Sequence, residues 1–155
     1  MTEPASSDHP PTTDLLADSG WLPVIAADRT LAEPAIAEGL RVTTPSPVML
    51  RSVIAPDAIG GVAVRPGDRV ILATYAANRA LGPFDPEANV GAVLRQLWFG
   101  AGSHFCLGAP LAMAQIRLLL GAVLDAGAVE VVSRRVARGQ LIPGYASLVL
   151  ARSTA

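Results

Sequence analysis

The segment 99–108, with the sequence FGAGSHFCLG, has residue types that suit chemistry rather than folding alone. It combines glycines, which let a backbone approach another group closely, with the single cysteine of the chain, Cys106. The apolar stretch opened by Pro110 predicts a helix directly after it. Unpaired amide hydrogens and positive potential at a helix N-terminus favour a thiolate, and a thiolate can bind a metal ion.

The composition limits which metal this thiolate could hold. With one cysteine and two histidines, His9 and His104, the chain has too few ligands for a zinc or multi-cysteine iron–sulfur site. One thiolate is enough for a haem iron, because the porphyrin supplies the four equatorial ligands. Other interpretations stay open at this point. A lone cysteine is usually an inert core thiol, His104 suits an ordinary loop histidine, and Gly100 with Gly102 partly matches a dinucleotide-binding turn.

Several functions are excluded by the charges and the termini. All 12 basic residues are arginine, so a lysine-dependent phosphate loop is absent, and their spread against 13 acids gives no basic patch for nucleic acid. The first residues do not resemble a secretion signal, so we do not expect one. The longest apolar stretch, residues 111–132, is interrupted by charges, which argues against a membrane span. We expect a cytoplasmic protein with neither nucleic acid nor membrane as partner.

Four segments, in order, resemble the cytochromes P450, which are haem-thiolate monooxygenases. The cysteine loop is similar to that family's Phe-x-x-Gly-x-His-x-Cys-x-Gly motif at every position. Glu38 and Arg41 match its Glu-x-x-Arg helix, and Arg51 follows at the spacing of its propionate-binding arginine. Residues 59–79 resemble its hairpin and following helix. The chain is therefore identified as a member of this superfamily, of bacterial type, over its C-terminal part only.

The resemblance implies a role for each matched residue. Cys106 would be the proximal ligand of the iron of haem b, while His104 and Arg51 would pair with the haem propionates. Phe99 would pack beside the sulfur, and three glycines would let the loop pass close to the porphyrin: Gly100, Gly102 and Gly108. Glu38 and Arg41 would be structural, although alone such a pair is most often a surface ion pair.

The sequence also departs from the family pattern. Members are far longer, and no Ala-Gly-x-x-Thr-like segment of the distal helix precedes Glu38, so no catalytic residue is assigned. Pro83 stands where the family usually has the arginine or histidine that completes the Glu-x-x-Arg network. Met113 and Gln115 replace the usual arginine and glutamate of the proximal helix.

The elements that would position these residues predict an α+β arrangement, the C-terminal portion of the mainly helical cytochrome P450 fold. The pattern predicts a helix over 31–42, short antiparallel strands with a hairpin through Pro66 and Gly67, and an irregular meander over 82–91. A buried helix over 110–126 and strands near 129–132 and 147–150 follow. Residues 1–20 are expected to be a disordered acidic tail, and residues 21–155 a truncated haem-binding region.

The resulting functional expectation is a haem-thiolate monooxygenase-type protein, in a truncated form that lacks the distal oxygen-activating helix. Its electron donor would be a ferredoxin or a flavin reductase. The alternatives are a non-catalytic remnant or protein-interaction module, or one half of a split enzyme. A complementary N-terminal half, or another protein, would then cover the exposed distal face.

Overall fold

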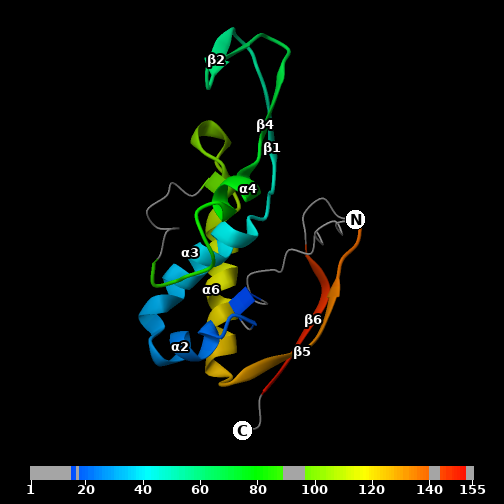
Figure 1. Ribbon diagram of the computed structural model, residues 1–155. Coiled ribbons are helices and arrows are strands. Elements are labelled where there is room, and N and C mark those ends of the chain that lie inside the picture. Colours follow the sequence, from blue (N-terminus) through cyan, green and yellow to red (C-terminus); the bar gives the residue numbers. More distant parts are fainter. Residues whose placement is uncertain (1–14, 17, 89–96, 140–143, 153–155) are drawn as a thin grey trace, which may run out of the picture.

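A computed structural model describes residues 15–16, 18–88, 97–139 and 144–152 (Figure 1). Helices form the body of the molecule, and short strand pairs extend from it (Figure 1). No helix in these ranges combines the length and hydropathy that crossing a membrane requires.

The first helical layer is formed by α2 (Trp21–Ala27), the 3-10 turn η1 (Arg29–Leu31) and α3 (Ala32–Thr43). Asp28 caps η1, because its carboxylate accepts hydrogen bonds from the amide and the hydroxyl of Thr30. These two bonds lower the pKa of Asp28, the hydroxyl bond having the larger effect. Pro34 lies in the first turn of α3, where a proline is tolerated. The predicted helix over 31–42 is thus present within a residue at each end.

Helix α6 (Ala109–Asp125) packs against α2 and α3 along one side. Leu120 and Leu124 on this side are buried, whereas Leu111, Leu118 and Leu119 are exposed. The prediction of a buried helix is therefore wrong for the face that carries these three exposed leucines. Its apolar composition is that of a buried helix, but the described elements cover one face.

Within the described ranges, the strands form three separate antiparallel pairs. β1 (Met49–Ser52) pairs with β4 (Arg69–Leu72), β2 (Asp57–Ile59) pairs with β3 (Val62–Val64), and β5 (Val129–Val136) pairs with β6 (Tyr145–Arg152). The ribbon shows β1 and β4 leading from the body to the β2–β3 hairpin at one end of the molecule (Figure 1). A short helix, α4 (Thr74–Arg79), follows β4.

The hairpin predicted through Pro66 and Gly67 is wrong in its pairing. A turn does form there, with the Asp68 amide bonded to the Arg65 carbonyl at 3.0 Å, but the strands on either side pair elsewhere. The tight hairpin turn is instead Gly60-Gly61, where both residues have positive φ, of 58° and 83°. Two consecutive positive φ values suit a type I′ turn and its twist, which favours a two-residue hairpin.

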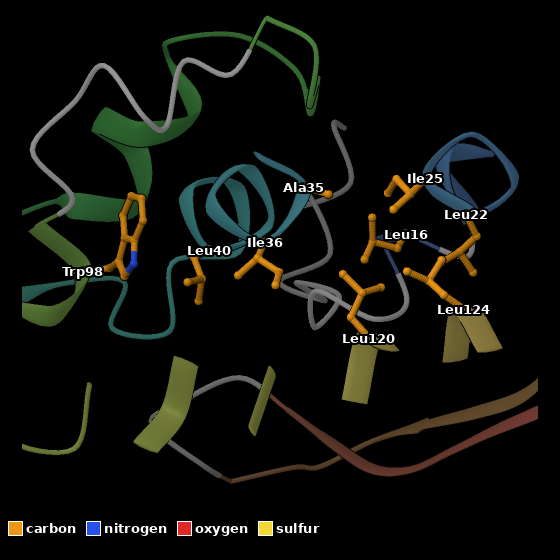
Figure 2. Close-up of a cluster of buried hydrophobic side chains, with 9 residues drawn as sticks. All are labelled: Leu16, Leu22, Ile25, Ala35, Ile36, Leu40, Trp98, Leu120 and Leu124. Carbon is orange, nitrogen blue, oxygen red and sulfur yellow. The ribbon is translucent and has the colours of Figure 1, made fainter. Parts of the chain in front are cut away.

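The hydrophobic core lies between α2, α3 and α6, with Ile36 and Leu40 of α3 reaching toward side chains of its neighbours (Figure 2). Leu16 belongs to this core and is 3% exposed. Asp18 pairs with Arg134 of β5 at 2.7 Å. Packed structure therefore begins before Trp21, earlier than predicted. Residues 1–14 and 17 of the expected tail, and residues 89–91 of the expected meander, lie outside the described residues.

Candidate functional site

The cysteine loop folds back on itself just before α6. It runs through two 3-10 turns, η2 (Leu97–Phe99) and η3 (Gly102–His104). The Cys106 amide donates to the Phe99 carbonyl at 2.7 Å, and the Cys106 carbonyl accepts from the Ala109 amide at 3.2 Å. These bonds place the cysteine between the loop and the first turn of the helix, with its side chain exposed.

Two glycines of the loop adopt positive φ for different local reasons. At Gly100, with φ 77°, an added Cβ would lie 3.0 Å from the His104 carbonyl oxygen. At Gly102, with φ 64°, an added Cβ would meet no atom within 4 Å, so only the backbone conformation favours glycine. Gly108 stands next to the thiol, since a Cβ there would lie 3.8 Å from the Cys106 Sγ.

A cavity of about 500 Å³ separates this loop from strand β1. One wall is made by Ser46 and by residues 49–52, and the other by Trp98, Phe99, Gly100, His104 and Cys106. Its volume is within the roughly 300–1,000 Å³ of small-molecule and cofactor sites. Of the residues predicted for the site, the structure brings together five around this cavity: Arg51, Phe99, Gly100, His104 and Cys106. Gly102 and Gly108 lie outside its lining.

Arg51 brings a positive charge to the cavity. Its guanidinium donates to the Leu50 carbonyl at 2.9 Å, and no carboxylate of the described residues pairs with it. The opposite wall holds the His104 ring and the Cys106 thiol. Within the ranges that the structure describes, no group of three or more His, Cys, Asp or Glu side chains could hold a metal ion by itself. The cavity thus offers one thiol and a cationic side chain.

Glu38 and Arg41 form a fully buried ion pair within α3. The Arg41 Nη2 lies 2.6 Å from a Glu38 carboxylate oxygen, and both side chains are 0% exposed. Three backbone carbonyls accept the remaining guanidinium protons, those of Asn78 at 2.6 Å, Gly82 at 3.2 Å and Pro83 at 2.7 Å. Pro83 has no charged side chain, and its carbonyl accepts a hydrogen bond from Arg41, whereas an arginine or histidine at this position would donate one.

Sequence reasoning missed part of the cavity lining. Trp98 is 5% exposed, and its Nε1 is buried without a hydrogen-bond partner in the described structure. Its place directly before the Phe99–Gly108 motif was the available signal. Ser46, Met49 and Leu50 also line the cavity, and for these the signal was their closeness to Arg51 in the sequence.

Comparison with known proteins defines the family. Residues 26–141 match the family model described as Cytochrome P450. This match covers most of the chain, and the chain therefore belongs to the cytochrome P450 family. The predicted family and fold class are confirmed.

Two curated relatives come from Streptomyces. The chain is 37% identical over 115 residues to the 20-oxo-5-O-mycaminosyltylactone 23-monooxygenase of Streptomyces fradiae. This match covers 72% of this chain and 25% of that protein. It is 33% identical over 116 residues to the cytochrome P450 monooxygenase PikC of Streptomyces venezuelae, covering 72% of this chain and 28% of PikC. The chain thus matches about a quarter of the length of these relatives.

Solved structures show the same fold. CYP164A2 of Mycobacterium smegmatis, with econazole bound, aligns with a TM-score of 0.78 and 30% identity, over 90% of this chain and 36% of that chain. CYP109B1 of Bacillus subtilis aligns with a TM-score of 0.77 and 26% identity, over 94% of this chain and 43% of that chain. The helices and small antiparallel sheets described above therefore form a part of the cytochrome P450 fold.

Proposed function

We propose that this chain is the haem-thiolate portion of a cytochrome P450-type monooxygenase and binds haem b in the cavity between β1 and the cysteine loop. Residues 21–155 would form this haem-binding region. The observation that carries the proposal is the meeting of an exposed thiol, Cys106, with Arg51 and His104 around one cavity. Membership of the family implies haem iron as the cofactor.

The donor set of the cavity fits this cofactor. A haem iron needs one protein ligand on its proximal side, and the thiolate of Cys106 is of the type that these monooxygenases use. The haem propionates need cationic or hydrogen-bonding partners, and Arg51 has no carboxylate partner among the described residues. Gly100 keeps the backbone at the cavity wall free of a Cβ, which would crowd the His104 carbonyl.

Four residues of the cavity lining have defined tasks in this proposal. Cys106 holds the iron, Arg51 and His104 hold the propionates, and the Phe99 ring packs beside the sulfur. The rings of Phe99 and Phe105 meet edge to face at 6.4 Å, which brings two parts of the cysteine loop together. When bound, the haem supplies the activation of dioxygen for insertion of one oxygen atom into an apolar substrate.

A hollow beside the loop gives an electron donor a place to approach. It has a volume of about 320 Å³ and is lined by two rings of the loop and by residues of α6: Phe99, Phe105, Ala109, Pro110, Met113 and Arg117. We propose that a ferredoxin or flavin-reductase donor docks there, because Phe99 and Phe105 belong to the loop that carries Cys106. Met113 stands where the family usually has a charged residue. This surface is therefore less charged than one that binds a partner through ion pairs.

The exposed leucines favour a second function for the chain, the binding of a complementary polypeptide. Leu111 and Leu118 are 65% and 75% exposed on α6, and the chain corresponds to about a quarter of its relatives' length. Large exposed apolar patches mark interaction surfaces. We propose that the remaining part of a cytochrome P450 covers this face and the open side of the cavity, and that oxygenation requires this complement. We expect this assembly in the cytoplasm.

Haem binding is tested by reconstitution. The purified chain is mixed with haem, reduced and exposed to carbon monoxide beside a Cys106→Ala variant. The wild type should show the Soret shift typical of a thiolate ligand, and the variant should lose it. Equal spectra for the two proteins would refute Cys106 as the ligand. An Arg51→Gln variant should keep the shift but release haem faster.

The complement is tested separately from the ligand. The N-terminal part of PikC that precedes the matched segment is added to the haem-loaded chain, and complex formation is followed by sedimentation. A Leu118→Asp variant should bind this fragment more weakly than an Arg138→Asp variant, whose change lies on an exposed strand-end loop. Equal binding by the two variants would contradict docking on α6.

A further inference from the structure

We infer that Thr44 and Asn78 form a positioning pair that fixes one wall of the haem cavity. The inference rests on the proposed function. Neither residue lines the cavity, and neither belongs to the residues predicted for the site. Both act on the segment that carries Arg51.

Thr44 occupies an unusual backbone conformation at the end of α3. Its φ is 30° and its ψ is 91°, and it is the one non-glycine residue with positive φ among the described residues. For a β-branched residue, such a conformation is strained and persists where the surroundings hold it. The side chain is 0% exposed, so those surroundings are protein atoms. The chain leaves α3 here and continues toward β1.

A closed set of hydrogen bonds holds this turn. The Asn78 side-chain amide donates to the Thr44 hydroxyl at 2.9 Å, and that hydroxyl donates to the Arg41 carbonyl at 2.6 Å. The Arg41 guanidinium in turn donates to the Asn78 carbonyl at 2.6 Å. Asn78 therefore joins the buried ion pair to the strained turn through both its backbone and its side chain.

Helix α4 also holds the chain that follows the turn. The Thr74 hydroxyl donates to the Ser46 carbonyl at 2.7 Å, and the Tyr75 amide donates to the Pro47 carbonyl at 3.0 Å. Ser46 is the first residue of the cavity wall, and β1 begins at Met49. The direction in which β1 leaves the body, and hence the place of Arg51, is set between Thr44 and Pro47.

Loss of the Asn78 amide or the Thr44 hydroxyl should therefore loosen the wall without removing any group that contacts haem. The relevant variants are Asn78→Ala and Thr44→Val, and Thr44→Ser keeps the hydroxyl. Thr43→Val is a matched control at the neighbouring residue. The Thr43 hydroxyl donates a hydrogen bond of the same length, 2.6 Å, to the Gly39 carbonyl.

The first measurement is amide hydrogen exchange in the haem-free chain of 155 residues. Asn78→Ala and Thr44→Val should speed exchange of the peptide covering residues 46–52 by about fivefold to tenfold, the size expected for one buried hydrogen bond. Exchange of β5 and β6 should not change, whereas a general loss of stability would speed both regions. Thr44→Ser and Thr43→Val should resemble the wild type. Unchanged exchange of the 46–52 peptide would overturn the inference.

The second measurement is the rate at which haem leaves the chain, followed by transfer to apomyoglobin. The same two variants should lose haem several-fold faster than the wild type, and Thr44→Ser should restore the slow rate. Faster wall exchange with an unchanged haem-loss rate would also overturn the inference, while the proposed function would stand. A wild-type chain that binds no haem would instead refute the proposed function. The inference would then fail as well, because there would be no haem cavity whose wall Thr44 and Asn78 could fix.

Discussion

Arg41 uses every nitrogen of its guanidinium in a buried network. Its Nε and Nη2 donate to the Glu38 carboxylate, while Nη1 and Nη2 donate to carbonyls of the chain between α4 and residue 83. A buried charge is tolerated when a partner and hydrogen bonds satisfy it, and it becomes costly when one partner is removed. The pair therefore connects α3 to the segment after α4.

Replacing Glu38 with alanine should destabilise the fold strongly. The substitution leaves the Arg41 charge buried and uncompensated, which costs about 3–5 kcal/mol of unfolding free energy. Glu33→Ala on the same helix is the control, because its pair with Arg117 is exposed and worth about 0.2–1 kcal/mol. Urea unfolding of both variants measures the difference. Equal losses would show that burial of the pair carries no extra cost.

The two positive-φ glycines of the cysteine loop should differ in their tolerance of alanine. Both substitutions incur the left-handed backbone penalty of about 1–2 kcal/mol. Gly100→Ala also brings a Cβ to 3.0 Å from the His104 carbonyl, whereas Gly102→Ala meets nothing. Thermal unfolding should place Gly100→Ala below Gly102→Ala in stability. The reverse order would contradict the loop geometry described here.

At the scale of elements, α6 has one face in the core and one face in solvent. Leu120→Ala, at a residue that is 6% exposed, should cost about 2–5 kcal/mol, because it leaves a cavity between α3 and α6. Leu118→Ala, at a residue that is 75% exposed, should change the unfolding free energy by at most about 0.5 kcal/mol. Chemical unfolding of the isolated chain compares them. A large loss for Leu118→Ala would mean that this face is covered.

An ion pair ties α3 to α6 and makes their contact sensitive to pH. The Arg117 guanidinium donates to both Glu33 oxygens, at 2.6 and 2.8 Å, and this hydrogen bonding lowers the pKa of Glu33 from its usual 4.5. The same bonds raise the pKa of Arg117. A carboxylate with a lowered folded-state pKa stabilises the fold above its unfolded pKa, and the contribution is lost as the pH falls through the folded value.

Comparison with Glu33→Gln should reveal this dependence. The wild type should be slightly more stable near neutral pH, by less than about 1 kcal/mol because the pair is exposed. The difference should shrink as the pH falls below 4.5 and vanish once Glu33 is protonated in the folded state as well. Denaturant midpoints of both proteins across this range provide the measurement. A difference that does not vary with pH would exclude the charge of Glu33 as its cause.

At the scale of the whole molecule, local patterns were predictable and long-range arrangements were not. The cysteine loop and the α3 helix follow from residues close in sequence, so their spacing was sufficient. The pairing of β1 with β4 joins Met49 to Leu72, and no local signal distinguishes it from a hairpin at Pro66. The burial of α6 depends on which elements surround it. Side-chain types could not predict that Arg41 would donate to backbone carbonyls, because every residue has a carbonyl.

The cavity wall also has an optical consequence. The chain contains two tryptophans, and Trp98 lines the cavity, whereas Trp21 packs edge to face against Phe84 at 6.4 Å. An excited indole transfers its energy to a nearby porphyrin, whose absorption overlaps the indole emission. In a Trp21→Phe chain, the remaining fluorescence would therefore dim as the cavity fills. The protein carries its own intrinsic fluorophore for titrating its cofactor, and no dye need be attached.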